Sequence, residues 1–216
     1  MADSTRAFDA SRLRVLPRGF CQRPVLTVAR ELIGKYVVRD LDGELLVGRI
    51  VETEAYRGPE DRAAHSFGGR RTQRTEVMYG AAGLCYVFRI YGMHDQLNVV
   101  AGEEGQPHAV LIRALEPCVG WEQLRGRRRG RDGNVLPDRQ LMNGPGKLAQ
   151  ALDVGLEFYG HALDQHPLQL AELPGATKPK LVRSPRVGVD YAGTWALKPW
   201  RFSERDSPWV SVKPAL

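Results

Sequence analysis

Apolar residues recur at helical spacing early in the chain and at strand spacing afterwards. Between 25 and 33 they lie three or four positions apart and Gly34 follows, so the pattern predicts a short amphipathic helix over 25–33. Residues 36–41 and 45–54 are rich in β-branched and apolar side chains, and the Asp-Gly pair at 42–43 is typical of a two-residue hairpin turn. The first part of the chain is therefore predicted to be a helix followed by a β-hairpin.

The middle of the chain predicts a functional loop and more strands. Residues 57–75 combine Gly, Pro, His and arginines without a period, which indicates a long surface loop of the kind that often carries function. A second hairpin is predicted from strands over 84–91 and 96–100, joined across 92–95, and a further strand over 109–115. We expect these strands to form the middle of a sheet.

The remaining segments define the ends of the domain. The polar residues 1–23 are interpreted as a partly ordered lead-in, and 24–216 as the folded domain. Five arginines lie within 125–131 beside glycines, which predicts a solvated loop. A helix is predicted to open with Asn143 as its N-cap and to run through Leu152.

The composition narrows the class of protein. With 216 residues, of which 43% are apolar, the chain can bury one core, and its net charge of +6 favours a polyanionic partner such as nucleic acid. Cys21, Cys85 and Cys118 are widely spaced and odd in number, which argues against a disulfide framework or a tetrathiolate zinc site. No stretch has the pattern of a membrane helix or an export signal, so we expect a cytoplasmic protein.

One strand brings chemically useful side chains together. Side chains alternate along a strand, so Glu52, Glu54 and Tyr56 share a face, and His65 follows in the adjoining loop. Glutamates at a strand end usually face water or pair with arginines. Here an apolar run leads directly into them, and neighbouring carboxylates raise each other's pKa, which suits a group that accepts a proton near neutral pH. The pattern predicts a pocket.

Other motifs exclude alternatives. His65 has no HxE, HExxH or Cys partner, so neither a metal site nor a zinc deaminase is expected. The sequence Gly-Pro-Gly-Lys at 144–147 is not a nucleotide-binding loop, because Leu141 and Leu148 replace residues that such a loop requires. It predicts a helix N-terminus at which Lys147 could hold one phosphate, although an ordinary capped helix explains these residues nearly as well.

Two surface features have both a plain and a functional interpretation. The hairpin tip carries Tyr91 and Met93, which either fold back on a neighbouring core or form a wedge that replaces an extruded base. The arginines at 125–131 are solvated charges that at most add attraction to phosphates without sequence preference.

Six segments of the chain form an ordered set of motifs: RIVETEAYRGPEDRAAHSFGGRRT (49–72), YGMHDQLNVV (91–100), VLIRALEP (110–117), GPGKL (144–148), RVGVDYAGTWALKPWRF (186–202) and SPWVSV (207–212). Together they resemble the alkyladenine (3-methyladenine) DNA glycosylase family, from about Pro24 to Val212. The arginine run at 125–131 and the leading residues lie outside this resemblance.

The resemblance implies a fold and a set of roles. The fold is a single mixed α/β domain around a curved antiparallel sheet, from which a β-hairpin protrudes into the minor groove of DNA. Glu54 matches the general base and Arg113 an arginine that helps to hold the attacking water. Tyr56 and His65 match residues that contact the flipped purine, and Asn98 matches the residue that excludes the amino group of guanine.

The resemblance also identifies a pocket wall and a DNA surface. Leu111 lies near the pocket wall, Tyr91 matches the intercalating tyrosine, and Met93 stands beside it. Phe88 is a departure, since some family members place a second stacking tyrosine here, and the lost hydroxyl could shift lesion preference. The residues expected at the DNA backbone are Arg70, Thr72, Gly146 and Lys147.

The expected activity follows from these matches. We expect a monomeric enzyme without cofactor or metal that binds double-stranded DNA and removes purines such as 3-methyladenine, 7-methylguanine, hypoxanthine and ethenoadenine. No lysine stands at the nucleophile position, so the product is expected to be an abasic site. The sequence leaves the proton donor to the leaving base unassigned. Two alternatives remain open: an O-glycosidase that uses Glu52 and Glu54, and a non-catalytic nucleic-acid-binding protein.

Overall fold

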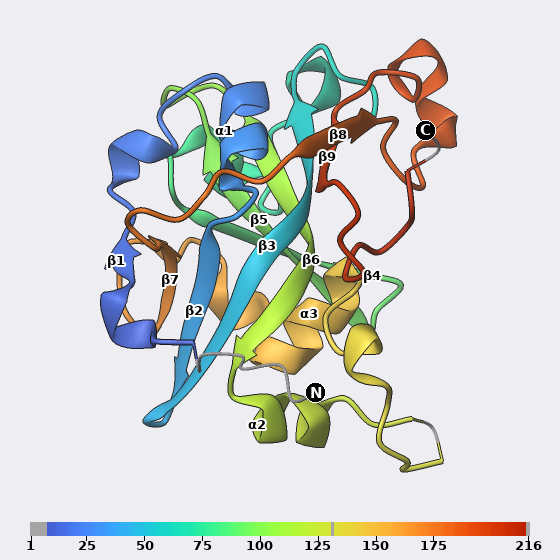
Figure 1. The fold of residues 1–216 in the computed structure, drawn as a ribbon. Helices are drawn as coiled ribbons and strands as arrows, with labels where there is room; N and C mark the ends of the chain where they lie inside the picture. Colours follow the sequence, from blue (N-terminus) through green and yellow to red (C-terminus); the bar gives the residue numbers. More distant parts are fainter. Residues whose placement is uncertain (1–7, 131, 215–216) are drawn as a thin grey trace.

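The central feature of the fold is an antiparallel sheet whose longest strands, β3 (Glu44–Arg57) and β6 (His108–Val119), lie side by side. The computed structural model describes residues 8–130 and 132–214, and within them the sheet has nine strands (Figure 1). Their order is β1-β7-β2-β3-β6-β5-β4, with β9 beside β3 and β8 beside β9. The other strands are β1 (Arg14–Val15), β2 (Tyr36–Leu41), β4 (Cys85–Ile90), β5 (His94–Ala101), β7 (Leu168–Glu172), β8 (Leu181–Ser184) and β9 (Arg201–Glu204).

Three α-helices accompany the sheet in the described residues: α1 (Val25–Leu32), α2 (Trp121–Arg127) and α3 (Pro145–Leu152). Helix α1 packs on β3 and β6, and α3 packs on β5 and β6. Figure 1 places α1 toward one end of the sheet and α2 at the other. The mixed α/β class expected from the sequence is confirmed. None of the helices in the described ranges has the length and hydropathy of a membrane span.

The short 3₁₀ helices lie in the connections. They are η1 (Ala10–Arg12), η2 (Arg18–Phe20), η3 (Phe67–Gly69), η4 (Glu76–Tyr79), η5 (Asp138–Gln140), η6 (Leu156–Phe158) and η7 (Asp190–Trp195). At the start of the chain, β1 pairs with β7, so residues 14–15 of the predicted lead-in belong to the sheet. Residues 1–7 lie outside the described part.

The two faces of the sheet have different roles. Val110 and Ile112 on β6 are fully buried and belong to the core cluster that includes the apolar side chains of α1 and α3. Leu111 and Arg113 alternate with them and therefore lie on the other face, as does Asn98 on β5. One face thus stabilises the domain, and the opposite face is available for a site.

The structure confirms both predicted hairpins but moves one turn. Residues 42–43 both have positive φ, as a type I′ turn requires, and join β2 to β3. In the second hairpin β4 ends at Ile90 and β5 begins at His94, so the predicted turn at 92–95 was wrong by one to two residues. Tyr91 adopts φ 53°, which takes it out of the strand and into the turn.

Two predicted helix details change. Helix α1 ends at Leu32, one residue before the predicted end. The N-cap of α3 is Gly144 rather than Asn143. Instead of accepting from the helix backbone, the Asn143 side chain accepts a hydrogen bond from Lys147 Nζ at 2.8 Å. The Asn143 side-chain oxygen that could have capped the helix is therefore bound by Lys147 instead.

The arginine run at 125–131 is partly helical, and two of its side chains form ion pairs, although the sequence predicted a solvated loop. Its first three residues continue α2, so the prediction of a loop throughout 125–131 was wrong. Arg125 forms two 2.9 Å hydrogen bonds to Asp138, and Arg127 pairs with Asp153 at 3.0 Å. These acidic partners lie on η5 and just after α3, where only the folded chain brings them close. Position 131 lies outside the described residues.

The long loop after β3 is firmly held by buried contacts. Asp61 and Arg186 are both fully buried at their side chains and form hydrogen bonds of 2.5 and 2.9 Å. Arg186 also donates to the carbonyl oxygen of Ala55 at 2.9 Å, and Ser66 Oγ donates to the carbonyl oxygen of Pro107. Apart from Arg57, which is the last residue of β3, the predicted loop contains no strand, and tertiary contacts fix its path.

We predict that Asp61→Asn destabilises the protein by roughly 3–5 kcal/mol, because Arg186 would remain buried without its charged partner. Urea denaturation followed by circular dichroism measures this loss as a lower midpoint at unchanged slope.

The matched control is Glu60→Gln. Glu60 pairs with Arg57 at 2.9 Å, but both side chains are exposed, so its loss should cost less than about 1 kcal/mol. Equal shifts of the two midpoints would contradict the assigned role of the buried pair.

Candidate active site

A cavity of about 220 Å³ lies on the sheet face opposite α1 and α3. Its lining comes from β3, β4, β5, β6, the loop after β3 and the segment that leads into η7. The walls include the sequence-predicted residues Tyr56, His65, Phe88, Tyr91, Asn98, Leu111 and Arg113. The wall is mainly aromatic and apolar, with few polar groups, which is typical of a site for a small planar ligand.

Glu54 lies fully buried beneath this wall. Its Oε2 accepts hydrogen bonds from the Tyr56 hydroxyl at 2.8 Å and from Arg113 Nη1 at 3.2 Å. Its Oε1 accepts from the backbone N–H of Val187 at 2.7 Å. All three donor residues line the cavity, so the carboxylate is held directly behind its surface.

Glu52 is also fully buried but is tied more completely. Its Oε1 accepts from Arg113 Nε at 3.1 Å, Arg201 Nη1 at 2.9 Å and Ser211 Oγ at 2.9 Å. Its Oε2 accepts from the backbone N–H of Ser211 at 2.6 Å. Neither glutamate is itself among the residues that line the cavity, and of the donors to Glu52 only Arg113 is. Glu52 anchors Arg113 and the segment near Ser211.

The two carboxylates differ in their hydrogen-bond donors. An ionised carboxylate offers about four lone-pair sites. Among the described residues Glu52 has four donors, whereas Glu54 has three. On each carboxylate one oxygen has a single donor, Oε2 of Glu52 and Oε1 of Glu54, but all three donors to Glu54 belong to residues that line the cavity, whereas only Arg113 does so among the donors to Glu52.

The electrostatic environment of Glu54 suits a base. Burial raises the pKa of Glu54 above its ordinary value, against the lowering effects of Arg113, the Val187 N–H and Tyr56. Glu52 raises the pKa further, but it is the smallest of these influences. The sequence analysis attributed the effect to neighbouring carboxylates, whereas desolvation is the main cause.

An aromatic cluster forms the wall beside the loop. The ring of His65 meets that of Phe88 edge to face with centroids 4.6 Å apart, and Tyr86 lies 5.3 Å from Phe88. The guanidinium of Arg74 stands over the Phe88 ring at 4.8 Å. Phe88, the predicted departure from the family, is therefore packed into the wall and presents an aromatic surface there.

The hydrogen bonds of His65 define its protonation. Arg74 Nη2 lies 3.2 Å from Nε2, and because arginine only donates, Nε2 must accept. The proton then lies on Nδ1, which donates to the Tyr86 hydroxyl at 2.7 Å. Burial, and then the charge of Arg74, lower the pKa of His65 from 6.5 to about 4. The imidazole is neutral at neutral pH.

The hairpin tip stands out from the wall. Tyr91 is 85% exposed and Met93 is 71% exposed, so neither folds back onto a core.

On strand β5, the Asn98 amide nitrogen donates to the carbonyl oxygens of Tyr86 and Gln96, at 3.0 and 3.1 Å. These two bonds fix the orientation of the Asn98 amide at the cavity wall.

The residues predicted at the DNA backbone lie outside this cavity. Arg70 and Thr72 line a second cavity that adjoins the first. Gly146 and Lys147 lie in the first turn of α3, where Gly146 packs against the side chain of His94. The described residues bring together no group of three His, Cys, Asp or Glu side chains suited to holding a metal ion.

Comparison with known proteins identifies the family. The family model described as methylpurine-DNA glycosylase matches residues 19–208. The chain belongs to the methylpurine-DNA glycosylase family. A protein of Desulfitobacterium hafniense (strain Y51) is 48% identical over 93% of this chain and 100% of its own. One of Bacillus cytotoxicus is 42% identical over 90% of this chain and 98% of its own, and both are named "Putative 3-methyladenine DNA glycosylase".

Several cavity residues of this glycosylase family member were not identified from its sequence. Tyr86 lies two positions before Phe88 on β4, so strand alternation alone could have placed both in one wall. Val187 and Tyr191 lie in a segment quoted for the resemblance, but nothing local indicates that they face the cavity. Arg74, which contacts Phe88 and His65 of the wall, has no feature in the sequence other than its charge that predicts this position.

The neutral state of His65 gives a spectroscopic prediction. In NMR titrations its imidazole resonances should stay constant across the neutral range and move only near a pKa of about 4. Arg74→Ala should raise this pKa partway toward 6.5, because one of its two causes is removed. Arg71→Ala, which removes a guanidinium paired with Glu76, should leave it unchanged. A midpoint near 6.5 in the wild type would contradict the assigned environment.

Proposed function

We propose that the protein is a monofunctional DNA glycosylase that flips an alkylated or deaminated purine into the aromatic cavity and hydrolyses its N-glycosidic bond. Candidate substrates are 3-methyladenine, 7-methylguanine, hypoxanthine and ethenoadenine. Family membership supports the class of reaction. The observation that carries the proposal is Glu54, a buried carboxylate directly behind an aromatic cavity, whose three hydrogen-bond donors all belong to residues that line that cavity.

In the proposed mechanism Glu54 activates water. The water donates to the remaining lone pair of Glu54 and attacks C1′ of the sugar, while the bond to the base breaks and the carboxylate takes the proton. Its negative charge also stabilises the oxocarbenium-like sugar in the transition state. Arg113 and the Val187 N–H hold the carboxylate in position, so it reacts without first reorganising.

The cavity wall binds the extruded base. Tyr56, His65 and Phe88 offer aromatic surfaces, and stacking contributes roughly 1–3 kcal/mol per base, which offsets the loss of stacking in the duplex. A cationic alkylpurine gains further from these ring faces and leaves without protonation. Because His65 is neutral and its Nδ1 proton is directed at Tyr86, we do not assign it as the acid for neutral lesions.

The rest of the face supports contact with duplex DNA. We infer that Tyr91 enters the base stack in place of the flipped nucleotide, since its ring is exposed at a tip beside the cavity. Met93 would follow it into the groove. We assign the DNA phosphates to Arg70 and Thr72, which line the adjoining second cavity, and to Gly146 and Lys147 in the first turn of α3.

The alternatives left open by the sequence are less well supported. An O-glycosidase would need Glu52 as a second acid or nucleophile, but Glu52 accepts four hydrogen bonds from Arg113, Arg201 and Ser211, of which only Arg113 lines the cavity. A purely binding protein has no need to bury the carboxylate of Glu54 behind a pocket, where its desolvation is costly.

We predict that Glu54→Gln binds lesion-containing duplex yet loses excision by at least about 10²–10⁴-fold, because the amide cannot accept the proton from water. Single-turnover excision from duplexes that carry one hypoxanthine or 7-methylguanine measures the rate. Glu60→Gln, which changes an exposed carboxylate outside the cavity, is the control and should retain activity.

The product identifies the reaction class. The wild type should leave an abasic site that breaks only on treatment with alkali, and borohydride should trap no protein–DNA adduct. Near-full turnover by Glu54→Gln would rule out the assigned base, and a trapped adduct would rule out the monofunctional mechanism.

A further prediction concerns the hairpin tip. Tyr91→Ala should shift the flipping equilibrium of an ethenoadenine duplex by roughly 1–3 kcal/mol, because the ring no longer fills the vacated stack. Stopped-flow fluorescence of the modified base measures this shift. Tyr91→Phe keeps the ring and should behave as the wild type, whereas equal flipping in all three proteins would assign the tip a structural role.

A further inference from the structure

Tyr86 carries a hydroxyl group at the wall of the proposed base cavity. The residue lies on β4, is only 2% exposed and lines the cavity together with Phe88. Its carbonyl oxygen accepts from the Asn98 amide at 3.0 Å. Its ring contacts those of Phe88 and His65 at centroid distances of 5.3 and 6.2 Å. The strand backbone and the neighbouring rings thus fix the position of the hydroxyl.

The direction of the Tyr86 proton follows from its neighbours. Because Arg74 donates to His65 Nε2, the neutral imidazole carries its proton on Nδ1 and donates it to the Tyr86 hydroxyl oxygen at 2.7 Å. That bond uses a lone pair of the oxygen and leaves the O–H itself free to donate. In residues 8–130 and 132–214 no acceptor receives this proton. Since Tyr86 is buried and lines the cavity, the O–H is available to a molecule inside the cavity.

A donor without an acceptor is costly in a buried place. It gives up the hydrogen bond that it would make to water, and folded proteins therefore contain few such groups outside functional sites. Burial also raises the pKa of Tyr86 to about 12, so the hydroxyl keeps its proton at neutral pH. The group is therefore suited to donating a hydrogen bond to a ligand rather than to transferring its proton.

We propose that the Tyr86 hydroxyl donates a hydrogen bond to the extruded purine, at N7 or O6. Hypoxanthine offers both acceptors on one edge of the base. The bond strengthens as the base departs, because the electrons of the breaking glycosidic bond move onto the purine and make its acceptors more negative. Tyr86 is thereby a specificity-determining residue that favours neutral purines, whose departure needs this help. The inference rests on the proposed function and adds a contact that recognises the base.

Binding measures this contact without excision. Three duplexes carry hypoxanthine, 7-deazahypoxanthine, which lacks the N7 acceptor, or unsubstituted purine, which lacks O6. Each base stands on a 2′-fluorinated sugar, whose glycosidic bond resists hydrolysis, and Kd is measured by fluorescence anisotropy. Tyr86→Phe should bind the hypoxanthine duplex about tenfold more weakly than the wild type, as expected for a lost hydrogen bond. On the analogue that lacks the contacted atom, the two proteins should bind equally.

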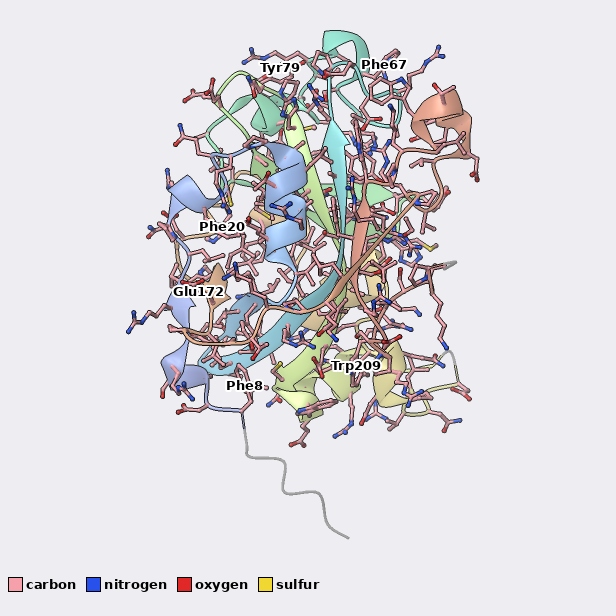
Figure 2. All side chains as sticks on the ribbon, turned by 45° about the horizontal axis from the view of Figure 1, so that its top comes forward. Phe8, Phe20, Phe67, Tyr79, Glu172 and Trp209 are labelled. Atoms are coloured by element: carbon pink, nitrogen blue, oxygen red, sulfur yellow. The ribbon has the colours of Figure 1, made fainter. Side chains whose placement is uncertain are left out.

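Tyr79→Phe is the matched control. The Tyr79 hydroxyl donates to the carbonyl oxygen of Arg70 at 3.2 Å and does not line the base cavity. Figure 2 shows Tyr79 at the outer edge of the molecule, at the same end as Phe67. This variant should discriminate among the three duplexes as the wild type does. An equal loss by Tyr86→Phe on all three duplexes would show that the hydroxyl acts only through His65 or the fold, and no loss on any would show that it does not touch the base. Either result overturns the proposal.

The rate of excision tests the role in departure. In single turnovers Tyr86→Phe should lose at least about tenfold with hypoxanthine but less than about threefold with 7-methylguanine, a cationic base that leaves without gaining negative charge. Equal losses on both lesions would contradict this role. Excision of hypoxanthine by the wild type is scored separately. If no abasic product forms, the proposed function fails, whereas product formed equally by the wild type and Tyr86→Phe overturns only the present inference.

Discussion

The site depends on the bridge that Arg113 makes between two buried glutamates. Its Nε contacts Glu52 and its Nη1 contacts Glu54, and Arg201 supplies a second positive charge to Glu52. Burying a charge is costly unless it is paired and hydrogen-bonded, so these four side chains stabilise one another only as a set. The set holds Glu54 ionisable at a raised pKa directly behind an aromatic cavity.

The sheet explains how a reactive group and a stable core coexist. Each of the central strands alternates between an apolar face, covered by α1 and α3, and a face that carries the site. The side chains of the proposed site therefore do not interrupt the packing of the apolar core. This division also explains why the cavity can be mainly aromatic, because its walls extend the side-chain rows of a rigid sheet.

The site is completed by segments that are far apart in the sequence. The pair Asp61–Arg186 joins the loop after β3 to the segment that supplies the Val187 N–H, and Ser211 closes the contacts of Glu52. The same loop gives the shared wall between the two cavities through His65. These buried contacts together set the shape of the cavity and the position of the Glu54 carboxylate behind it.

The sequence by itself determined most of the elements and which face of β3 carries the proposed site. Periodicity placed α1 and both hairpins, and alternation along β3 put Glu52, Glu54 and Tyr56 on one face, because these signals are local. Only the tertiary structure decided which glutamate is held by residues of the cavity wall, that burial dominates the pKa of Glu54, and that Gly144 rather than Asn143 caps α3. Those outcomes depend on partners brought together by folding, which spacing along the chain does not encode.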